Sequence, residues 1–175
     1  MLNKPDGYIS ATFDKHDPIV LDLIDSSYLV FEPFPVGRLD KDTEGLLVLT
    51  NDGQLAHRVL SPKKHVEKCY FLKISNPLTE EHVRRIENGI EIDQGEVCKP
   101  AKVQIIDDTS LKLWITEGKF HQIKRMMIAC DSEVTYLQRL SMGPLLLDPS
   151  LKLGEYRTCT EKEIEDLLAI KERKK

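Results

Sequence analysis

The order of the apolar runs restricts the fold class of this chain more than any other property, because some strand-like runs follow one another directly while short helix patterns separate the others. These runs cover residues 46–50, 66–74, 97–106, 111–116, 133–140 and 145–147. Strands in succession with scattered helices are typical of an α+β fold with a mixed, mainly antiparallel sheet and flanking helices. With no repeat and no long linker, the 175 residues predict one domain, 1–175.

Helix signals stand between and after these runs. Residues 54–60 form a short helix pattern, and Thr79 opens a second helix that Asn88-Gly89 ends. Thr160 with Glu163 three residues later predicts a capping box at a C-terminal helix. Residues 119–130 predict a further helix whose buried and polar faces separate at a period of 3.6 residues. We expect Phe120, Ile123, Met127 and Cys130 on its apolar face and His121, Lys124 and Arg125 on the other.

Composition restricts the protein class. The chain carries 25 Lys and Arg against 29 Asp and Glu, a net charge of −4, so a nucleic acid would have to meet a local basic patch. No apolar run approaches the roughly 18–20 residues that cross a bilayer, and the start lacks a secretory signal. We therefore expect a cytoplasmic protein without a membrane partner. The four cysteines form no metal-binding or paired spacing, which favours reduced thiols near the core and no metal site.

Two local clusters supply such a basic patch. Four lysines against one glutamate give residues 61–75 a charge of +3, and residues 119–125 carry another +3. Tyr70 and Phe71 are interleaved with the first cluster, and on a strand only one of them can face solvent and stack on a base. Each cluster, viewed alone, is equally consistent with a solvated protein face.

The acidic turn over residues 37–45 has two interpretations from the residues alone. Asp40, Asp42 and Glu44 take the spacing of a calcium loop, but Asn51 stands where that loop needs a glutamate, and prolines precede the turn. The alternative is that these acids cap and solvate a turn. Nucleotide-binding motifs are missing from the sequence, including at Gly118–Gln122, so no cofactor is expected.

Five segments taken together resemble one family. Gly37-Arg38-Leu39-Asp40 followed by Thr43-Glu44-Gly45 is similar to the catalytic-aspartate motif of RNA pseudouridine synthases. Four further segments match that family in the same order. They are residues 2–8, 61–70, 117–126 and 154–157. The His-Gln-Ile-Lys-Arg-Met form of residues 121–126 is most similar to the RsuA branch, which modifies small-subunit ribosomal RNA.

The resemblance implies a pseudouridine synthase catalytic fold with a central cleft and assigns roles to particular residues. Asp40 would be the essential carboxylate acting at the glycosidic bond of the target uridine. Tyr70 would stack on the flipped base, with a further role in proton transfer left open. Lys124 would pair with the catalytic carboxylate, and Leu140 would pack on the other face of the uracil.

The remaining implications concern RNA contacts and substrate. Arg38 and Arg125 would contact phosphate or support the residues that contact substrate. The reaction is an isomerisation without net redox change, so it needs no cofactor. Members of this branch usually carry a basic S4-type RNA-binding domain ahead of the Asn-Lys-Pro segment, and we expect this chain to be the catalytic domain without it.

The resemblance therefore predicts an rRNA pseudouridine synthase, a monomer by default, acting on a uridine of 16S rRNA. Its substrate would include partly assembled small ribosomal subunits, since the usual RNA-binding module is missing. Alternatives are a paralogue acting on 23S rRNA, a non-catalytic RNA-binding or ribosome-assembly factor with the same fold, and the calcium-loop protein.

Overall fold

The computed structural model describes residues 1–171 and divides them into two compact units. Unit 1 comprises residues 1–66 together with the segment from residue 139 onward, and unit 2 comprises residues 67–138. The chain passes from the first to the second after Val66 and returns within strand β8 (Val134–Met142). Each unit has its own paired strands and packed helices.

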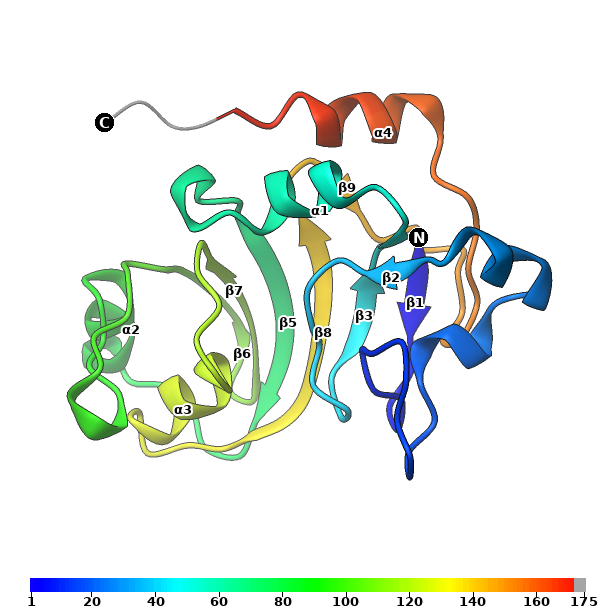
Figure 1. The fold of residues 1–175 in the computed structure, drawn as a ribbon. Helices are drawn as coiled ribbons and strands as arrows, with labels where there is room; N and C mark the ends of the chain where they lie inside the picture. The colour runs from blue at the N-terminus through cyan, green and yellow to red at the C-terminus, as the bar shows by residue number, and fades with distance from the viewer. Residues whose placement is uncertain (172–175) are drawn as a thin grey trace. The chain divides into compact units, whose positions relative to one another are not determined.

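Unit 1 is built on short antiparallel pairings. Its strands are β1 (Leu2–Lys4), β2 (Phe34–Pro35), β3 (Glu44–Leu47), β4 (Leu49–Thr50), the end of β8, and β9 (Leu145–Leu146). Its helices are α1 (Gly53–Leu60), α4 (Glu161–Leu168) and the 3-10 helices η1 (Val20–Leu23), η2 (Ser26–Phe31) and η3 (Pro62–Lys64). Strand β1 pairs with β3, β2 with β4, and β8 with β9, all antiparallel (Figure 1).

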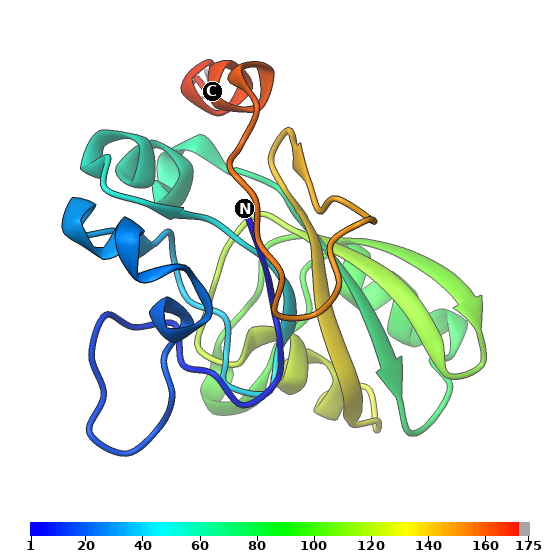
Figure 2. The ribbon, with the colours of Figure 1, turned by 90° about the vertical axis from the view of Figure 1, so that its right-hand side faces the viewer.

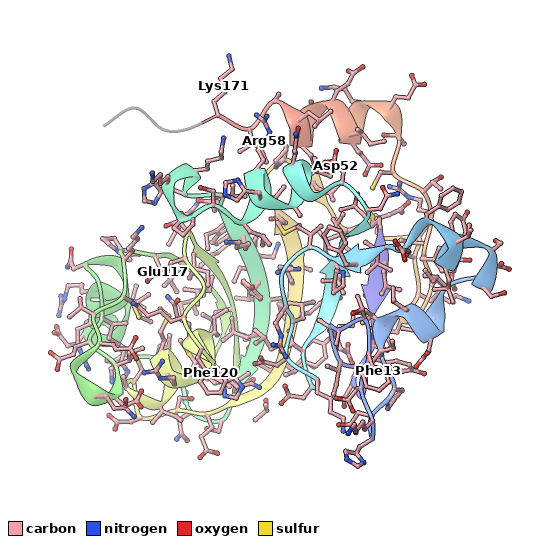
Figure 3. The ribbon with its side chains drawn as sticks, viewed as in Figure 1. Phe13, Asp52, Arg58, Glu117, Phe120 and Lys171 are labelled. Carbon is pink, nitrogen blue, oxygen red and sulfur yellow. The ribbon has the colours of Figure 1, made fainter. Side chains whose placement is uncertain are left out.

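The core of unit 1 joins these strands to the two helices. It contains Met1, Val36, Leu46, Val48, Leu55, Ala56, Val59, Val66, Met142, Leu145 and Leu167. Helix α4 packs against α1 and β9 (Figure 2). The Asp52 side chain caps the start of α1, and Arg58 donates to the carbonyl of Ile170 at 3.2 Å, which fastens the chain beyond α4 to α1 (Figure 3).

Unit 2 is an antiparallel sheet of longer strands with helices in the connections. Its strands are β5 (Lys68–Ile74), β6 (Lys102–Asp107), β7 (Ser110–Ile115) and the start of β8. Its helices are α2 (Glu80–Glu87), α3 (Gln122–Ile128) and the 3-10 helix η4 (Asp93–Gly95). Strand β7 lies in the middle and pairs antiparallel with β5 on one side and β6 on the other.

The two faces of this sheet differ in burial. Tyr70 and Leu72 of β5 lie on the same face as Leu113 and Leu111, their partners on β7, and all four are buried. Ile86 of α2 and Ile123, Met126 and Met127 of α3 are buried as well, whereas Ile128 is exposed. Both helices lie on one side of the strands (Figure 1). Phe71, by alternation, faces the opposite side, where it is half-buried. Of the two neighbouring aromatics, Phe71 and not Tyr70 is therefore on the solvent side.

Most of the predicted architecture is confirmed. The fold is α+β, and the strand pairings named above are antiparallel. Helix α1 covers the predicted 54–60, Thr79 caps α2, and Thr160 and Glu163 form the predicted capping box of α4. All four cysteines are free thiols, three of them buried, as expected.

One prediction about the helix at 119–130 is wrong. Helix α3 begins only at Gln122, because His121 adopts a left-handed conformation with φ of 47° and the Gln122 side chain accepts a hydrogen bond from the Lys119 N–H. Phe120 thus precedes the helix and is 77% exposed, instead of packing beside Ile123 (Figure 3). Strand β6 also begins at Lys102 and not at residue 97, since Pro100 cannot donate a ladder hydrogen bond.

None of the helices within residues 1–171 has the length and apolar character needed to span a bilayer.

Candidate active site

The loop that carries Asp40 is fixed by hydrogen bonds within unit 1. The Thr43 N–H donates to the Asp40 carbonyl at 2.9 Å and closes a turn around the carboxylate residue. Just before it, the Leu39 N–H donates to the Ser10 hydroxyl at 3.1 Å, and that hydroxyl donates to the Leu39 carbonyl at 3.0 Å. The Asp40 side chain is half-buried on this turn. A carboxylate is thus presented on a backbone whose conformation is fixed from both sides.

A buried lysine completes this anchoring. Lys4, at the end of β1, has no solvent exposure. Its ammonium donates to the carbonyls of Asp40 at 3.1 Å, Lys41 at 3.0 Å and Thr43 at 2.8 Å, and to that of Pro5 at 3.0 Å. Burial lowers the pKa of Lys4 to about 8, against the opposing pull of nearby carboxylates. These three carbonyl contacts hold the Asp40 loop against β1.

The resemblance assigned no role to Lys4, although this lysine lies in the Asn-Lys-Pro segment. A lysine is almost never fully buried unless its charge has partners, so its position in a strand gave no reason to expect burial. The one sequence signal that could have indicated its burial is its position close to Leu2 at the start of the chain.

The end of the loop is equally restricted. Gly45 has φ of +106°, and a Cβ added there would lie 2.3 Å from the carbonyl oxygen of Arg139. Arg139 is 3% exposed, and its Nε donates to the Leu46 carbonyl at 2.8 Å. Leu140, the candidate uracil-packing residue, follows directly and is half-buried. Glycine is therefore required where β3 meets the backbone of β8.

This geometry does not support the calcium-loop alternative. The chain continues from Glu44 as strand β3, whereas a calcium loop of that kind continues into a helix. Over residues 1–171, no three or more His, Cys, Asp or Glu side chains gather where they could hold a metal ion.

The remaining candidates lie in unit 2. Tyr70 is 9% exposed in the middle of β5, opposite Leu113. Lys124 is half-buried on α3. The six predicted residues are therefore distributed over both units. Unit 1 holds Arg38, Asp40 and Leu140, with Arg38 exposed two residues before Asp40, and unit 2 holds Tyr70, Lys124 and Arg125.

Arg125 bonds to acidic side chains and a carbonyl of its own unit. Its Nε donates to Asp93 and its Nη2 to Glu96, both at 2.6 Å, and its Nη1 donates to the Phe120 carbonyl at 3.0 Å. The hydrogen bonds to Glu96 and Asp93 raise the pKa of this guanidinium further above its usual value. Arg125 thus connects η4 to the start of α3.

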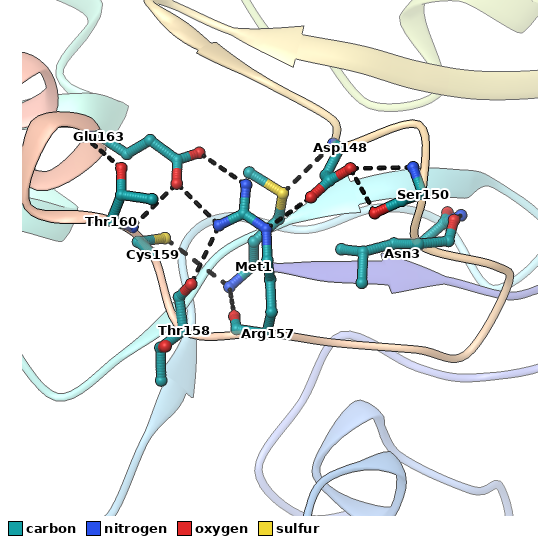
Figure 4. Close-up of polar contacts among 10 residues, drawn as sticks. Met1, Asn3, Asp148, Ser150, Arg157, Thr158, Cys159, Thr160 and Glu163 are labelled. Atoms are coloured by element: carbon teal, nitrogen blue, oxygen red, sulfur yellow. Dashed lines mark hydrogen bonds and ion pairs between the residues drawn. The ribbon is translucent and has the colours of Figure 1, made fainter.

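The C-terminal motif at residues 154–157 also has a structural explanation. Arg157 donates from Nε to Asp148 at 2.8 Å and from Nη1 to Glu163 at 2.7 Å, while its carbonyl accepts from the N-terminal ammonium of Met1 at 2.8 Å (Figure 4). Hydrogen bonds to Ser150 and Arg157 lower the pKa of Asp148 to about 2, and the bond to Arg157 lowers that of Glu163 to about 2. This network fastens α4 to the N-terminus.

Comparison with known proteins gives a consistent result. Residues 1–129 match the model of the family described as RNA pseudouridylate synthase. The chain is 52% identical over 168 residues to the "Uncharacterized RNA pseudouridine synthase YtzG" of Bacillus subtilis, covering 94% of this chain and 70% of the relative. It is 39% identical over 165 residues to the "Ribosomal small subunit pseudouridine synthase A" of Escherichia coli, covering 94% and 71%.

A solved structure described as "Crystal structure of pseudouridylate synthase" is similar with a TM-score of 0.89 and 42% identity, over 95% of this chain and 71% of that one. The family model covers well over half of the chain, and the matched region contains the complete Asp40 loop. The chain belongs to the RNA pseudouridylate synthase family.

Proposed function

We propose that this protein isomerises a uridine of 16S rRNA to pseudouridine, with Asp40 acting at the glycosidic bond. The observation that carries the proposal is the Asp40 loop, where a buried ammonium and a serine hydroxyl fix the backbone on both sides of a half-buried carboxylate. Preorganisation of this kind is what a catalytic group needs. The choice of 16S rRNA is supported by similarity to relatives named ribosomal small subunit pseudouridine synthase A.

The chemistry is balanced within one nucleotide. The N1–C1′ bond of uridine breaks, the uracil turns, C5 bonds to C1′, and the proton on C5 is lost while N1 gains one. A carboxylate serves this reaction by capturing C1′ as a nucleophile or by removing a sugar proton as a base. Either route needs the carboxylate ionised and held at a fixed distance from the sugar.

The other candidates would handle the base and the backbone. Flipping a uridine out of its stack costs a few kcal/mol, and Tyr70 and Leu140 would offset this by contacting the two faces of the uracil. Lys124 would pair with the Asp40 carboxylate, and Arg38 would contact RNA phosphate beside it. Because three donor groups of Arg125 already bond to protein, we propose that it supports α3 and contacts no phosphate.

We further propose that the protein acts as a cytoplasmic monomer on partly assembled small ribosomal subunits. Its net charge of −4 supports this proposal, since the chain has no general basic field to hold naked RNA. Equal turnover of naked 16S rRNA and of small-subunit precursor particles would contradict the preference for particles.

Mapping the product tests the function directly. Unmodified 16S rRNA, 23S rRNA and small-subunit particles are incubated with the protein, and pseudouridines are located by carbodiimide modification and primer extension. The proposal predicts one new pseudouridine in 16S rRNA. A modification confined to 23S rRNA would overturn the assignment to the small subunit, and no modification of any substrate would favour the non-catalytic factor.

A further inference from the structure

The face of the unit 2 sheet that points away from Tyr70 combines aromatic and basic side chains. Phe71 of β5 and Trp114 of β7 project from it, and Tyr136 of β8 contacts Phe71 edge to face, with ring centroids 6.1 Å apart. Lys73, Lys102 and Lys112 project from the same face. We refer to these six residues as the open sheet face.

The strand register places these side chains in adjacent positions. Lys102 lies opposite Trp114, and Lys112 lies opposite Phe71. Directly opposed residues on neighbouring antiparallel strands have Cβ atoms about 4.5–5.5 Å apart, so each ring has a lysine next to it. The helices cover the other face, where Tyr70 is buried. The open sheet face is thus a surface separate from the one that carries the candidate base-stacking tyrosine.

The charge of this face is opposite to that of the whole chain. Three lysines project from it, against two carboxylates on the same side: Asp107, which lies opposite Ser110, and Glu67, which precedes β5. Asp107, at the end of β6, accepts a hydrogen bond from the Thr109 N–H in the turn to β7. In a chain with a net charge of −4, this cationic patch is complementary to a polyanion.

The lysines already sit on the aromatic rings. The Lys102 ammonium lies 4.6 Å from the centroid of the Trp114 ring, and the Lys73 ammonium lies 5.8 Å from that of Tyr136. An exposed cation–π contact changes affinity only about two- to five-fold, whereas stacking of a base on an aromatic ring is worth about five- to 150-fold. A nucleobase can therefore displace a lysine from its ring, and the lysine can then bond to the phosphate next to that base.

From this geometry we infer that the open sheet face is an RNA-binding surface, on which unpaired bases stack against Phe71 and Trp114 while lysines hold the phosphates. Aromatic residues interleaved with lysines on an exposed sheet are how other sheet proteins bind single-stranded RNA. The inference rests on the proposed function only in taking RNA as the partner. It adds a second contact region on the substrate, outside the target uridine.

Trp114 is the only tryptophan of the chain, so its fluorescence reports on this surface directly. The probe is a single-stranded 12-nucleotide RNA from a 16S rRNA loop, titrated into the Asp40→Asn protein so that turnover does not interfere. We expect saturable quenching of Trp114. RNA binding detected by gel shift without any change in Trp114 fluorescence would overturn the inference.

Salt dependence supplies a second readout. The double variant Lys102→Gln/Lys112→Gln removes two charges from the open sheet face, and Lys15→Gln/Lys152→Gln removes two exposed charges from unit 1 as a matched control. The slope of log affinity against log salt is negative, and for single strands each lost phosphate contact reduces its magnitude by about 0.7. We expect a slope reduction of about 1.4 for the first variant and none for the control. Equal slopes for both variants would refute the surface.

Phe71→Leu tests stacking without changing charge. We expect it to weaken binding at least five-fold with an unchanged salt slope, and circular dichroism establishes that the sheet is intact. Unaltered affinity of a folded Phe71→Leu protein would contradict base stacking there. Because these readouts measure binding by a catalytically disabled protein, they can succeed even if no pseudouridine is ever formed.

Discussion

Replacing Gly45 by alanine is expected to destabilise the protein severely. The φ of +106° alone costs a residue with a side chain about 1–3 kcal/mol. The added Cβ would also meet the Arg139 carbonyl oxygen at 2.3 Å, and an ordinary contact begins at 3.4 Å, so the backbones must separate by about 1 Å. Losing one or two backbone hydrogen bonds at about 1 kcal/mol each brings the total to about 2–5 kcal/mol.

Thermal unfolding followed by far-UV circular dichroism measures this effect. For a chain of this size, each kcal/mol shifts Tm by about 2–4 °C, so we expect Gly45→Ala to lower Tm by about 10 °C. Gly53→Ala is the matched control, because nothing lies within 4 Å of its added Cβ at the start of α1. That variant should leave Tm unchanged or raise it slightly. A Gly45→Ala protein within 3 °C of the parent would refute the close approach between this glycine and Arg139.

Three further predictions concern charge and thiols. Burial lowers the pKa of Lys4 to about 8 in the folded protein, below its usual value of 10.5, so the folded protein releases this proton at lower pH than the unfolded chain does. The Tm of the parent should therefore rise relative to that of Lys4→Met between about pH 8 and 10. A parallel pH dependence of the two Tm values would contradict burial of the ammonium. The pKa values of Asp148 and Glu163 are lowered to about 2, so the two carboxylates stabilise the fold above about pH 4.5 and lose this contribution as the pH falls toward 2. Arg157→Gln should reduce this acid sensitivity. An unchanged acid unfolding transition would argue against the hydrogen-bond network around Arg157. Native protein should react with Ellman's reagent at one thiol, Cys159, with all four reacting after denaturation, whereas rapid reaction of two or more thiols would show that the buried cysteines are accessible.

Local sequence signals predicted those elements whose structure is determined locally. The Thr160 and Glu163 capping box satisfies helix N–H groups within three residues, so its residue types suffice to predict it. Thr79 caps α2 in the same way, except that the Thr79 N–H donates to Nδ1 of His82 and not to an acidic side chain. In both cases no distant part of the chain has to be known.

Features decided by distant contacts could not be predicted in this way. Lys4 is buried because the carbonyls that surround it come mainly from a loop about 36 residues away. Phe120 fits the apolar period of α3 but lies outside the helix, because His121 takes a left-handed conformation that periodicity does not reveal. Alternation along β5 likewise separates Tyr70 from Phe71 but does not say which of them the helices cover.

Arg125 shows the same limit for the candidate site. A cationic cluster in the sequence does not reveal the acidic partners that folding brings to it, here Asp93 and Glu96 from about 30 residues earlier. By contrast, the Asp40 motif identified the loop whose backbone the structure finds to be fixed by Lys4, Ser10 and Thr43.

Tritium release tests the central claim that Asp40 carries the reaction. The parent, Asp40→Asn and Asp42→Asn are incubated with 16S rRNA, free and in small-subunit particles, that contains 5-³H-uridine, because bonding of C5 to C1′ releases that tritium. Asp42 is an exposed carboxylate of the same loop and serves as the matched control. We predict release by the parent and by Asp42→Asn, and none by Asp40→Asn. Release by Asp40→Asn at the rate of the parent would contradict the assignment of the catalytic carboxylate.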